Sequence, residues 1–216
     1  MSDSDSFIQE VTEELKRDRM LALWKRYGVF VIALLVLLVV GAAGNSWWKH
    51  HKEQQARDAS AALMAAADLK TPEEQAKAYQ ELAQKGEAPL VARFRAAAAY
   101  VAAGDTAKAL DILDAIAANG ETDRVYSDLA ALKAIDLRTP TQSPDKTIEQ
   151  LGPLTEEGRP YRLLALEARA AAYISAGEQD KARTDLQTIM GDQFVTNELR
   201  QRVTQLLAAL GPAAES

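Results

Sequence analysis

Two stretches of the chain match one another at an offset of 73 residues, from residue 95 to residue 168. They read RAAAAYVAAGDTAKALDILDAI at 95–116 and ARAAAYISAGEQDKARTDLQTI at 168–189. In each stretch, small Ala residues and a Tyr precede a Gly with an acidic neighbour, and an Ala and a Leu follow it. Because Ala permits close helix packing and Gly ends a helix in a left-handed turn, each stretch is predicted to form a hairpin of two helices.

The paired turn positions are Tyr100 with Tyr173, Gly104 with Gly177, and Ala109 with Ala182. The pattern resembles the tetratricopeptide repeat, a helical hairpin of about 34 residues, and the offset is close to twice that period. A divergent middle repeat is therefore expected, with a first helix at 125–137, a turn at 139–146 and a short second helix at 147–154. The segment 197–211 is predicted to be a capping helix. The alternative is a generic Ala-rich bundle, and both interpretations are all-α.

The composition agrees with an all-α protein. Of the 216 residues, 48% are hydrophobic but only 6% are aromatic, so a core must consist of closely packed helices rather than large rings. The net charge of −6 disfavours binding to nucleic acid, because phosphate backbones repel an acidic surface. The chain has no Cys, which excludes disulfides, thiolate metal sites and Cys nucleophiles.

A long apolar run, YGVFVIALLVLLVVGAAGNSWW, occupies residues 27–48 and contains no charged residue. About 20 helical residues cross the hydrocarbon core of a bilayer, so the run predicts one transmembrane helix. A cleaved export signal is the alternative, since Ala42 and Gly44 are small residues at suitable spacing before Asn45. The 26 residues that precede the run argue against cleavage, because they are long for a signal peptide and include an acidic, helix-like stretch.

Aromatic and basic residues mark both ends of the predicted span, as expected at membrane interfaces. They are Trp24, Lys25, Arg26 and Tyr27 before it, and Trp47, Trp48 and Lys49 after it. Five Lys and Arg residues closely precede the span and three closely follow it. This imbalance predicts a cytoplasmic N-terminus and a main body on the far side of the membrane. In a bacterial cell the protein would be a single-pass inner-membrane protein with a periplasmic domain.

Four segments follow from these patterns. Residues 1–26 are expected to be a cytoplasmic arm, with an amphipathic helix after a capping box at Ser6 and Gln9. Residues 27–48 are the transmembrane helix, and residues 49–70 extend it until Thr71 and Pro72 begin a new helix. Residues 71–216 form the repeat domain with its C-terminal capping helix.

No pattern in the chain indicates catalysis. His50 and His51 are adjacent, so on a helix they diverge by about 100° and cannot readily share one metal ion. The chain has no GxSxG or HExxH motif and no Gly-rich phosphate loop after a strand. We therefore expect no catalytic residue, no cofactor and no metal site, and we expect that the protein is not an enzyme.

The order of features resembles the YfgM-like family of ancillary SecYEG translocon subunits. The resemblance covers nearly the whole chain and rests on the arm, the Trp-Trp rim at residues 47–48, the long helix and the A-A-Y-x-x-A-G-[DE] turns. It implies a scaffold without catalytic activity that assists exported proteins beside the SecYEG channel and a membrane-anchored periplasmic chaperone. It implies protein partners and no small-molecule substrate.

In repeats of this type the concave groove is lined mainly by the first helix of each hairpin. Counting back from the two turn glycines gives these candidate groove residues: Val91, Phe94, Ala98 and Val101, then Leu164, Glu167, Ala171 and Ile174. The set is mostly apolar and lacks a Lys, Arg and Asn cluster for a peptide carboxylate. It predicts loose recognition of apolar segments or a partner helix, although several members could instead pack between hairpins.

Two other functions remain open on these patterns. One is a scaffold or regulator of envelope biogenesis or cell division, which would hold a dedicated partner. The other is an autonomous holdase chaperone that works without the channel.

Overall fold

The computed structural model describes residues 25–26, 37–38, 40–41, 44–86 and 89–211. The chain divides into two compact units, Met1–Asp58 and Ala59–Ser216. All regular structure in the described residues is helical, which confirms the all-α prediction for them. Besides a helix over residues 44–67, the elements are α2 (Pro72–Lys85), α3 (Pro89–Ala102), α4 (Thr106–Ala117), α5 (Arg124–Arg138), α6 (Pro144–Leu151), the 3-10 helix η1 (Gly152–Thr155), α7 (Arg162–Ser175), α8 (Gln179–Gly191) and α9 (Asn197–Ala209).

Most of the predicted arm and most of the predicted membrane span lie outside the described residues, as do Trp24 and Tyr27. Where the chain is described, no helix is both long and apolar enough to cross a membrane. Of the other predicted interface residues, Lys25, Arg26, Trp47, Trp48 and Lys49 are exposed on helical backbone.

In the first unit, each exposed Trp ring contacts the side chain four residues further along the helix. The Trp47 ring stacks on the His51 ring with 5.6 Å between centroids, and the Lys52 ammonium lies 5.5 Å from the Trp48 centroid. His50 and His51 each contact a Gln side chain four residues further on. The two imidazoles therefore have different partners and do not converge on one point.

The helix of residues 44–67 ends three residues earlier than predicted. The Gln75 amide of α2 donates to the carbonyls of Ala67 and Leu69, and so satisfies helix-end acceptors that would otherwise lack donors. The next helix begins as predicted, with Thr71 as N-cap and Pro72 at the first helical position. Thr71 and Glu74 form a reciprocal capping box, because each side chain accepts a hydrogen bond from the other's backbone.

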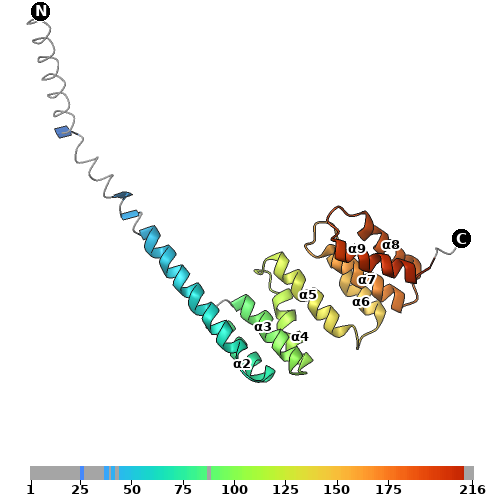
Figure 1. The fold of residues 1–216 in the computed structure, drawn as a ribbon, viewed down its shortest axis with the longest axis horizontal. Coiled ribbons are helices and arrows are strands. Elements are labelled where there is room, and N and C mark those ends of the chain that lie inside the picture. The colour runs from blue at the N-terminus through green and yellow to red at the C-terminus, as the bar shows by residue number, and fades with distance from the viewer. Residues whose placement is uncertain (1–24, 27–36, 39, 42–43, 87–88, 212–216) are drawn as a thin grey trace, which may run out of the picture. The chain divides into compact units, whose positions relative to one another are not determined.

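In the second unit, consecutive helices pack side by side in chain order from α2 to α9 (Figure 1). One core cluster joins residues 63–66 to α2, α3, α4 and α5, and a second joins α7, α8 and α9. A third cluster lies between them and consists of Ile135 of α5, Leu151 of α6, Leu154 of η1 and Ala165 of α7. The second unit is thus a stack of helical hairpins, and its buried clusters follow one another along the stack.

The two matching stretches fold into equivalent turns. Gly104 and Gly177 both have φ of 80°, in the left-handed region that Gly adopts without strain. The amide after each Gly donates to the Tyr carbonyl five residues back, from Asp105 to Tyr100 and from Glu178 to Tyr173. Each Gly amide donates to the carbonyl three residues back, which completes the Schellman pattern in both turns. Ala109 and Ala182, which follow the turns, are fully buried.

The middle hairpin differs from its prediction at the second helix. The segment 139–146 was expected to be a turn, but α6 already begins at Pro144, with Ser143 as its N-cap. Proline fits the first helical position because it lacks only an amide that has no helical partner there. The helix ends at Leu151, three residues before the predicted end at residue 154, and η1 continues the chain to Thr155.

Candidate functional site

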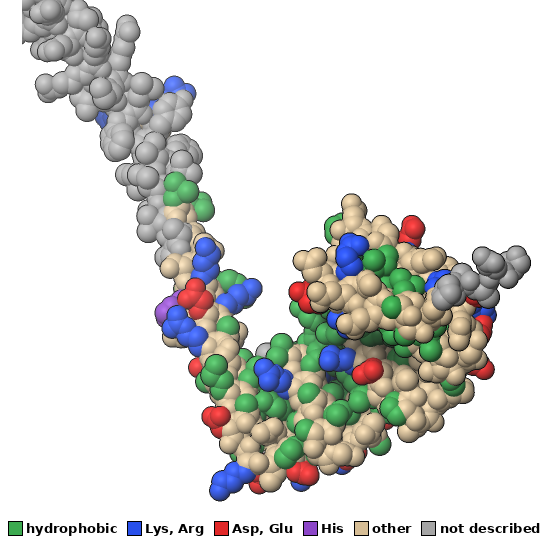
Figure 2. All heavy atoms as spheres, turned by 45° about the vertical axis from the view of Figure 1, so that its right-hand side comes forward, with side chains coloured by type: hydrophobic (Ala, Val, Ile, Leu, Met, Phe, Trp, Pro, Cys, Tyr) green, Lys and Arg blue, Asp and Glu red, His purple; other side chains and the backbone are tan. Residues whose placement is uncertain are grey.

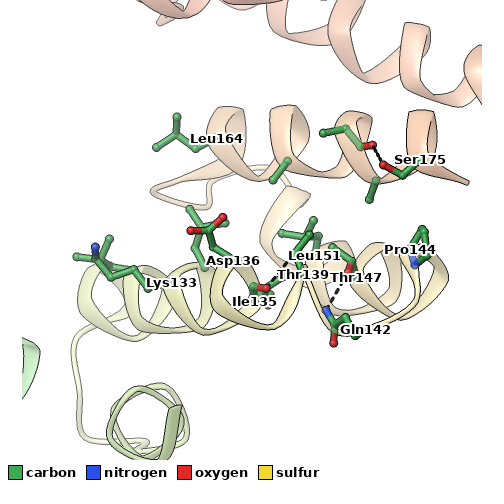
Figure 3. Close-up of a pocket in the computed structure, with 15 residues that line it drawn as sticks. Lys133, Ile135, Asp136, Thr139, Gln142, Pro144, Thr147, Leu151, Leu164 and Ser175 are labelled. Carbon is green, nitrogen blue, oxygen red and sulfur yellow. Dashed lines mark hydrogen bonds between the residues drawn. The ribbon is translucent and has the colours of Figure 1, made fainter. Parts of the chain in front are cut away.

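A cavity of about 480 Å³ opens between α5, α6 and α7 (Figure 3). Its floor is apolar, because Ile135, Leu151 and Ala172 are buried there. Leu129 and Leu132 of α5 and Leu164, Ala168 and Ala171 of α7 form the walls. Lys133, Asp136, Thr139, Gln142, Pro144, Thr147 and Ser175 complete the lining. The space-filling view also shows hydrophobic side chains gathered in a hollow of the repeat domain (Figure 2).

The hydroxyl groups that line the cavity already donate hydrogen bonds within the domain. Thr139 donates to the Ile135 carbonyl at 2.8 Å, and Ser175 donates to the Ala171 carbonyl at 3.0 Å. The Gln142 amide donates to Thr147 at 2.8 Å and to Gln150 at 3.1 Å. Since these donors are occupied, the hydroxyl and amide groups offer a ligand only acceptor oxygens, and the floor offers apolar contact.

Two charged side chains of α5 stand at one end of the cavity. Lys133 and Asp136 are exposed, and neither forms an ion pair with another described residue. In Figure 3, Asp136 rises from α5 toward α7, and Lys133 and Leu164 mark the same end. Pro144, Gln142 and Ser175 mark the opposite end. The cavity is therefore a short apolar trough with both signs of charge at one end only.

A bidentate ion pair connects α7, which forms one wall of the cavity, to α8. Arg169 donates from Nε and Nη2 to the Asp185 carboxylate, both at 2.8 Å, and from Nη1 to Thr155 of η1 at 2.8 Å. Asp185 is 5% exposed. Its carboxylate raises the pKa of Arg169, mainly through the hydrogen bonds. In the first hairpin the equivalent positions are Ala96 and Ile112, so this ion pair is a feature of the later hairpin alone.

Each repeat turn carries a Lys that bonds to the acidic residue after the Gly. Lys108 donates to Asp105 at 2.6 Å and lies 5.3 Å from the Tyr100 ring centroid. Lys181 pairs with Glu178 and lies 5.5 Å from the Tyr173 centroid. The hydrogen bond from Lys108 lowers the pKa of Asp105, and the same bond raises the pKa of Lys108. These contacts stabilise the turns and lie outside the cavity lining.

The structure brings only part of the predicted groove set together. Leu164 and Ala171 line the cavity. Glu167 instead accepts two hydrogen bonds from Arg202 of α9, at 2.7 and 2.8 Å, and Ile174 packs against the core of α7, α8 and α9.

The α3 members of the predicted set do not line this cavity. Val91 and Val101 are 51% and 40% exposed, and Ala98 is also exposed. Phe94 is half-buried and packs against the first core cluster. Whether these residues contact a partner stays a prediction.

The α5 wall was missed by counting from the turn glycines, because α5 ends without one. Leu129, Leu132, Lys133 and Asp136 lie at positions i, i+3, i+4 and i+7, which places them on one helical face. That spacing was the available signal. In the described part of the chain, no group of three or more His, Asp or Glu residues could hold a metal ion.

A family model described as a tetratricopeptide repeat-like domain matches residues 22–211. The chain belongs to this tetratricopeptide repeat-like family. The match takes in the apolar run as well as the helical hairpins. No curated protein and no solved structure matched the chain. Repeat-like domains of this family generally mediate contacts between proteins and are generally not catalytic, which agrees with an open apolar trough as the site.

Proposed function

We propose that this tetratricopeptide repeat-like protein is a membrane-anchored scaffold that holds partner proteins in the cavity between α5 and α7. The cavity carries the proposal, because it joins an apolar floor to walls from two different hairpins. A trough of this kind provides the apolar burial that a protein contact requires. The hydroxyls of Thr139 and Ser175 and the Gln142 amide donate internally, which favours contact with side chains over chemistry on a small molecule.

The proposed anchor is the helix predicted for residues 27–48. Its support is the uncharged run itself, the aromatic and basic residues on both sides, and a family match that includes it. The excess of basic residues before the run favours a cytoplasmic N-terminus and a repeat domain in the periplasm of a bacterial cell.

The proposed setting is the SecYEG translocon, where the protein would assist exported proteins beside a membrane-anchored periplasmic chaperone. Support comes from the resemblance of the whole feature order to the YfgM-like family. The described helix at residues 44–58 presents exposed Trp and Lys side chains that suit the outer membrane interface.

Site-specific photocrosslinking in native membranes tests this setting. A photoreactive residue at Ala171, inside the cavity, should crosslink to translocon subunits and to a periplasmic chaperone. The same residue at Ala107, which is exposed on α4 outside the cavity, is the matched control. Adducts without any translocon subunit would contradict the setting. Adducts with one dedicated division or envelope-assembly protein would support that alternative, and scattered clients without the channel would support a holdase.

The topology has a separate test, made simple by the lack of native Cys. Ser4→Cys and Ala107→Cys variants each carry one thiol, and a membrane-impermeant maleimide is added to cells with a permeabilised outer membrane. The proposed topology predicts labelling of Ala107→Cys in these cells, and of Ser4→Cys only after lysis. The reverse pattern would overturn it, and so would labelling of both thiols before lysis.

A further inference from the structure

We propose that the cavity between α5 and α7 binds its partner as an amphipathic α-helix rather than as an extended peptide. This inference rests on the proposed function, because it names the kind of partner that the same cavity takes. Three properties of the cavity lead to it: the internal use of its hydroxyl and amide donors, the small residues on one wall, and the position of its two charges.

The first property concerns the backbone of the partner. An extended segment brings unpaired N–H and C=O groups into contact with the groove, and each one costs free energy if it is buried without a partner. Here the hydroxyls of Thr139 and Ser175 already donate to backbone carbonyls of their own helices. Both N–H groups of the Gln142 amide are used as well. These side chains therefore have no free O–H or N–H for the carbonyls of an extended segment, whereas the carbonyls inside a helix are already paired within that helix.

The second property is the small size of the α7 wall. Ala168, Ala171 and Ala172 line the cavity, so the axis of an incoming helix can approach α7 closely. The lining on α7 runs from Leu164 to Ser175, which is about 16 Å, or three helical turns, at 1.5 Å per residue. A helix of about three turns therefore matches the length of the trough.

The third property is charge. Lys133 and Asp136 are three residues apart on α5, and neither pairs with another described residue. Facing residues three or four apart on a partner helix can carry one acidic and one basic side chain toward them. Because both charges stand at one end of the cavity, they select one direction of the bound helix.

Two peptides of identical composition provide the first test. Both are fluorescent 14-residue peptides of Leu, Ala, Gln, Lys and Glu with blocked ends. In the helical peptide the apolar residues recur every three or four positions, and in the alternating peptide they recur every two. Their binding to the full-length protein in lipid nanodiscs is measured by fluorescence anisotropy. We expect the helical peptide to bind at least about tenfold more tightly. Equal or tighter binding of the alternating peptide would overturn the inference.

The matched variants Ala171→Trp and Ala98→Trp locate the binding. The two positions are equivalent in the two hairpins, since 98 and 171 differ by the repeat offset, and both are exposed. Only Ala171 lines the cavity. Ala171→Trp should weaken the helical peptide about tenfold or more, while Ala98→Trp should leave it within about twofold. Equal loss in both variants, each with an unchanged melting temperature, would place binding elsewhere and overturn the assignment.

A charge exchange tests the direction of the helix. Two helical peptides differ only by exchange of one Lys and one Glu. The wild-type protein should prefer one of them, and the double variant Lys133→Glu/Asp136→Lys should prefer the other. Lack of any preference in both proteins would contradict a role for these two charges.

The crosslinking experiment separates this inference from the proposed setting. If Ala171 captures translocon subunits but the alternating peptide binds best, the helix inference fails and the setting stands. If the helical peptide binds best at this wall and no translocon subunit is captured, the setting fails and the inference stands.

Discussion

Arg169 and Asp185 form a two-bonded ion pair between α7 and α8, with both N–O distances at 2.8 Å. The equivalent residues of the first hairpin, Ala96 and Ile112, occupy the same places with apolar side chains. One hairpin geometry is therefore compatible with two kinds of contact between its helices. The two kinds of contact should differ in how much stability is lost when one of the two side chains is removed.

Asp185→Ala should destabilise the protein by about 3 kcal/mol, because it leaves the Arg169 guanidinium without its carboxylate in a largely buried place. The double variant Arg169→Ala/Asp185→Ile imports the pair of the first hairpin and should recover most of that loss. Urea unfolding of both variants measures the effect. A double variant as unstable as the single one would show that the apolar pair of the first hairpin cannot replace the ion pair in the later hairpin.

The turn glycines give a second prediction. Gly104→Ala and Gly177→Ala should each cost about 1 kcal/mol, because a Cβ is strained at φ of 80° although nothing lies within 4 Å of it. Gly191→Ala is the control, since Gly191 ends α8 without a positive φ and is also in open space. It should be neutral or slightly stabilising. Thermal unfolding of the three variants decides, and equal losses would contradict a conformational cause.

The third prediction is that the folding stability of the protein depends on pH through Asp105. Its pKa is lowered in the folded protein, first by the hydrogen bond from the Lys108 side chain. A lowered folded pKa means that its stabilising contribution is present above the unfolded pKa and is lost as pH falls through the folded pKa.

Asp105→Asn keeps an N-cap acceptor and removes the charge. Its stability deficit relative to the wild type should be present at pH 7 and should shrink as the pH falls below the usual pKa of Asp, about 4. Urea unfolding from pH 7 to pH 3 measures this difference. A deficit that stays constant over the range would contradict the linkage.

Arg183 holds the end of α9 and gives a fourth prediction. Its guanidinium donates to the carbonyls of Gly211 at 2.8 Å and Leu210 at 3.4 Å. Arg183→Leu should speed hydrogen exchange in the last turn of α9, consistent with a local loss of about 1 to 2 kcal/mol. Arg200→Leu, on the exposed side of α9, is the control and should leave the exchange unchanged. Equal exchange in the two variants would remove the capping role from Arg183.

The hairpins were predictable because their determinants are local. Gly104 and Gly177 end their helices through backbone conformation, and a few neighbouring residues specify that conformation. The start of α6 differs from the prediction, because Pro144 occupies the first helical position rather than a turn and Ser143 before it supplies the N-cap. The start of α6 is also predictable from the sequence if the Ser-Pro pair is interpreted as a helix start.

The site was less predictable because it depends on contacts between distant residues. Glu167 has the right position on its helix for the groove, but Arg202, 35 residues away, holds its carboxylate. The cavity forms only because α5 lies opposite α7. The sequence match between the outer hairpins does not include α5, so it does not predict this pairing. Such pairings follow from the packing of whole helices, which local spacing does not specify.

The second helix of the middle hairpin has eight residues, while α4 has twelve and α8 has thirteen. An engineer who regularised this chain by copying the outer hairpins into the middle would lengthen α6 and replace its Pro-containing connection with a Gly turn. The product would be a more uniform and easily designed solenoid. It would also place new side chains beside the trough, so the irregular hairpin is the part that such a redesign should leave unaltered.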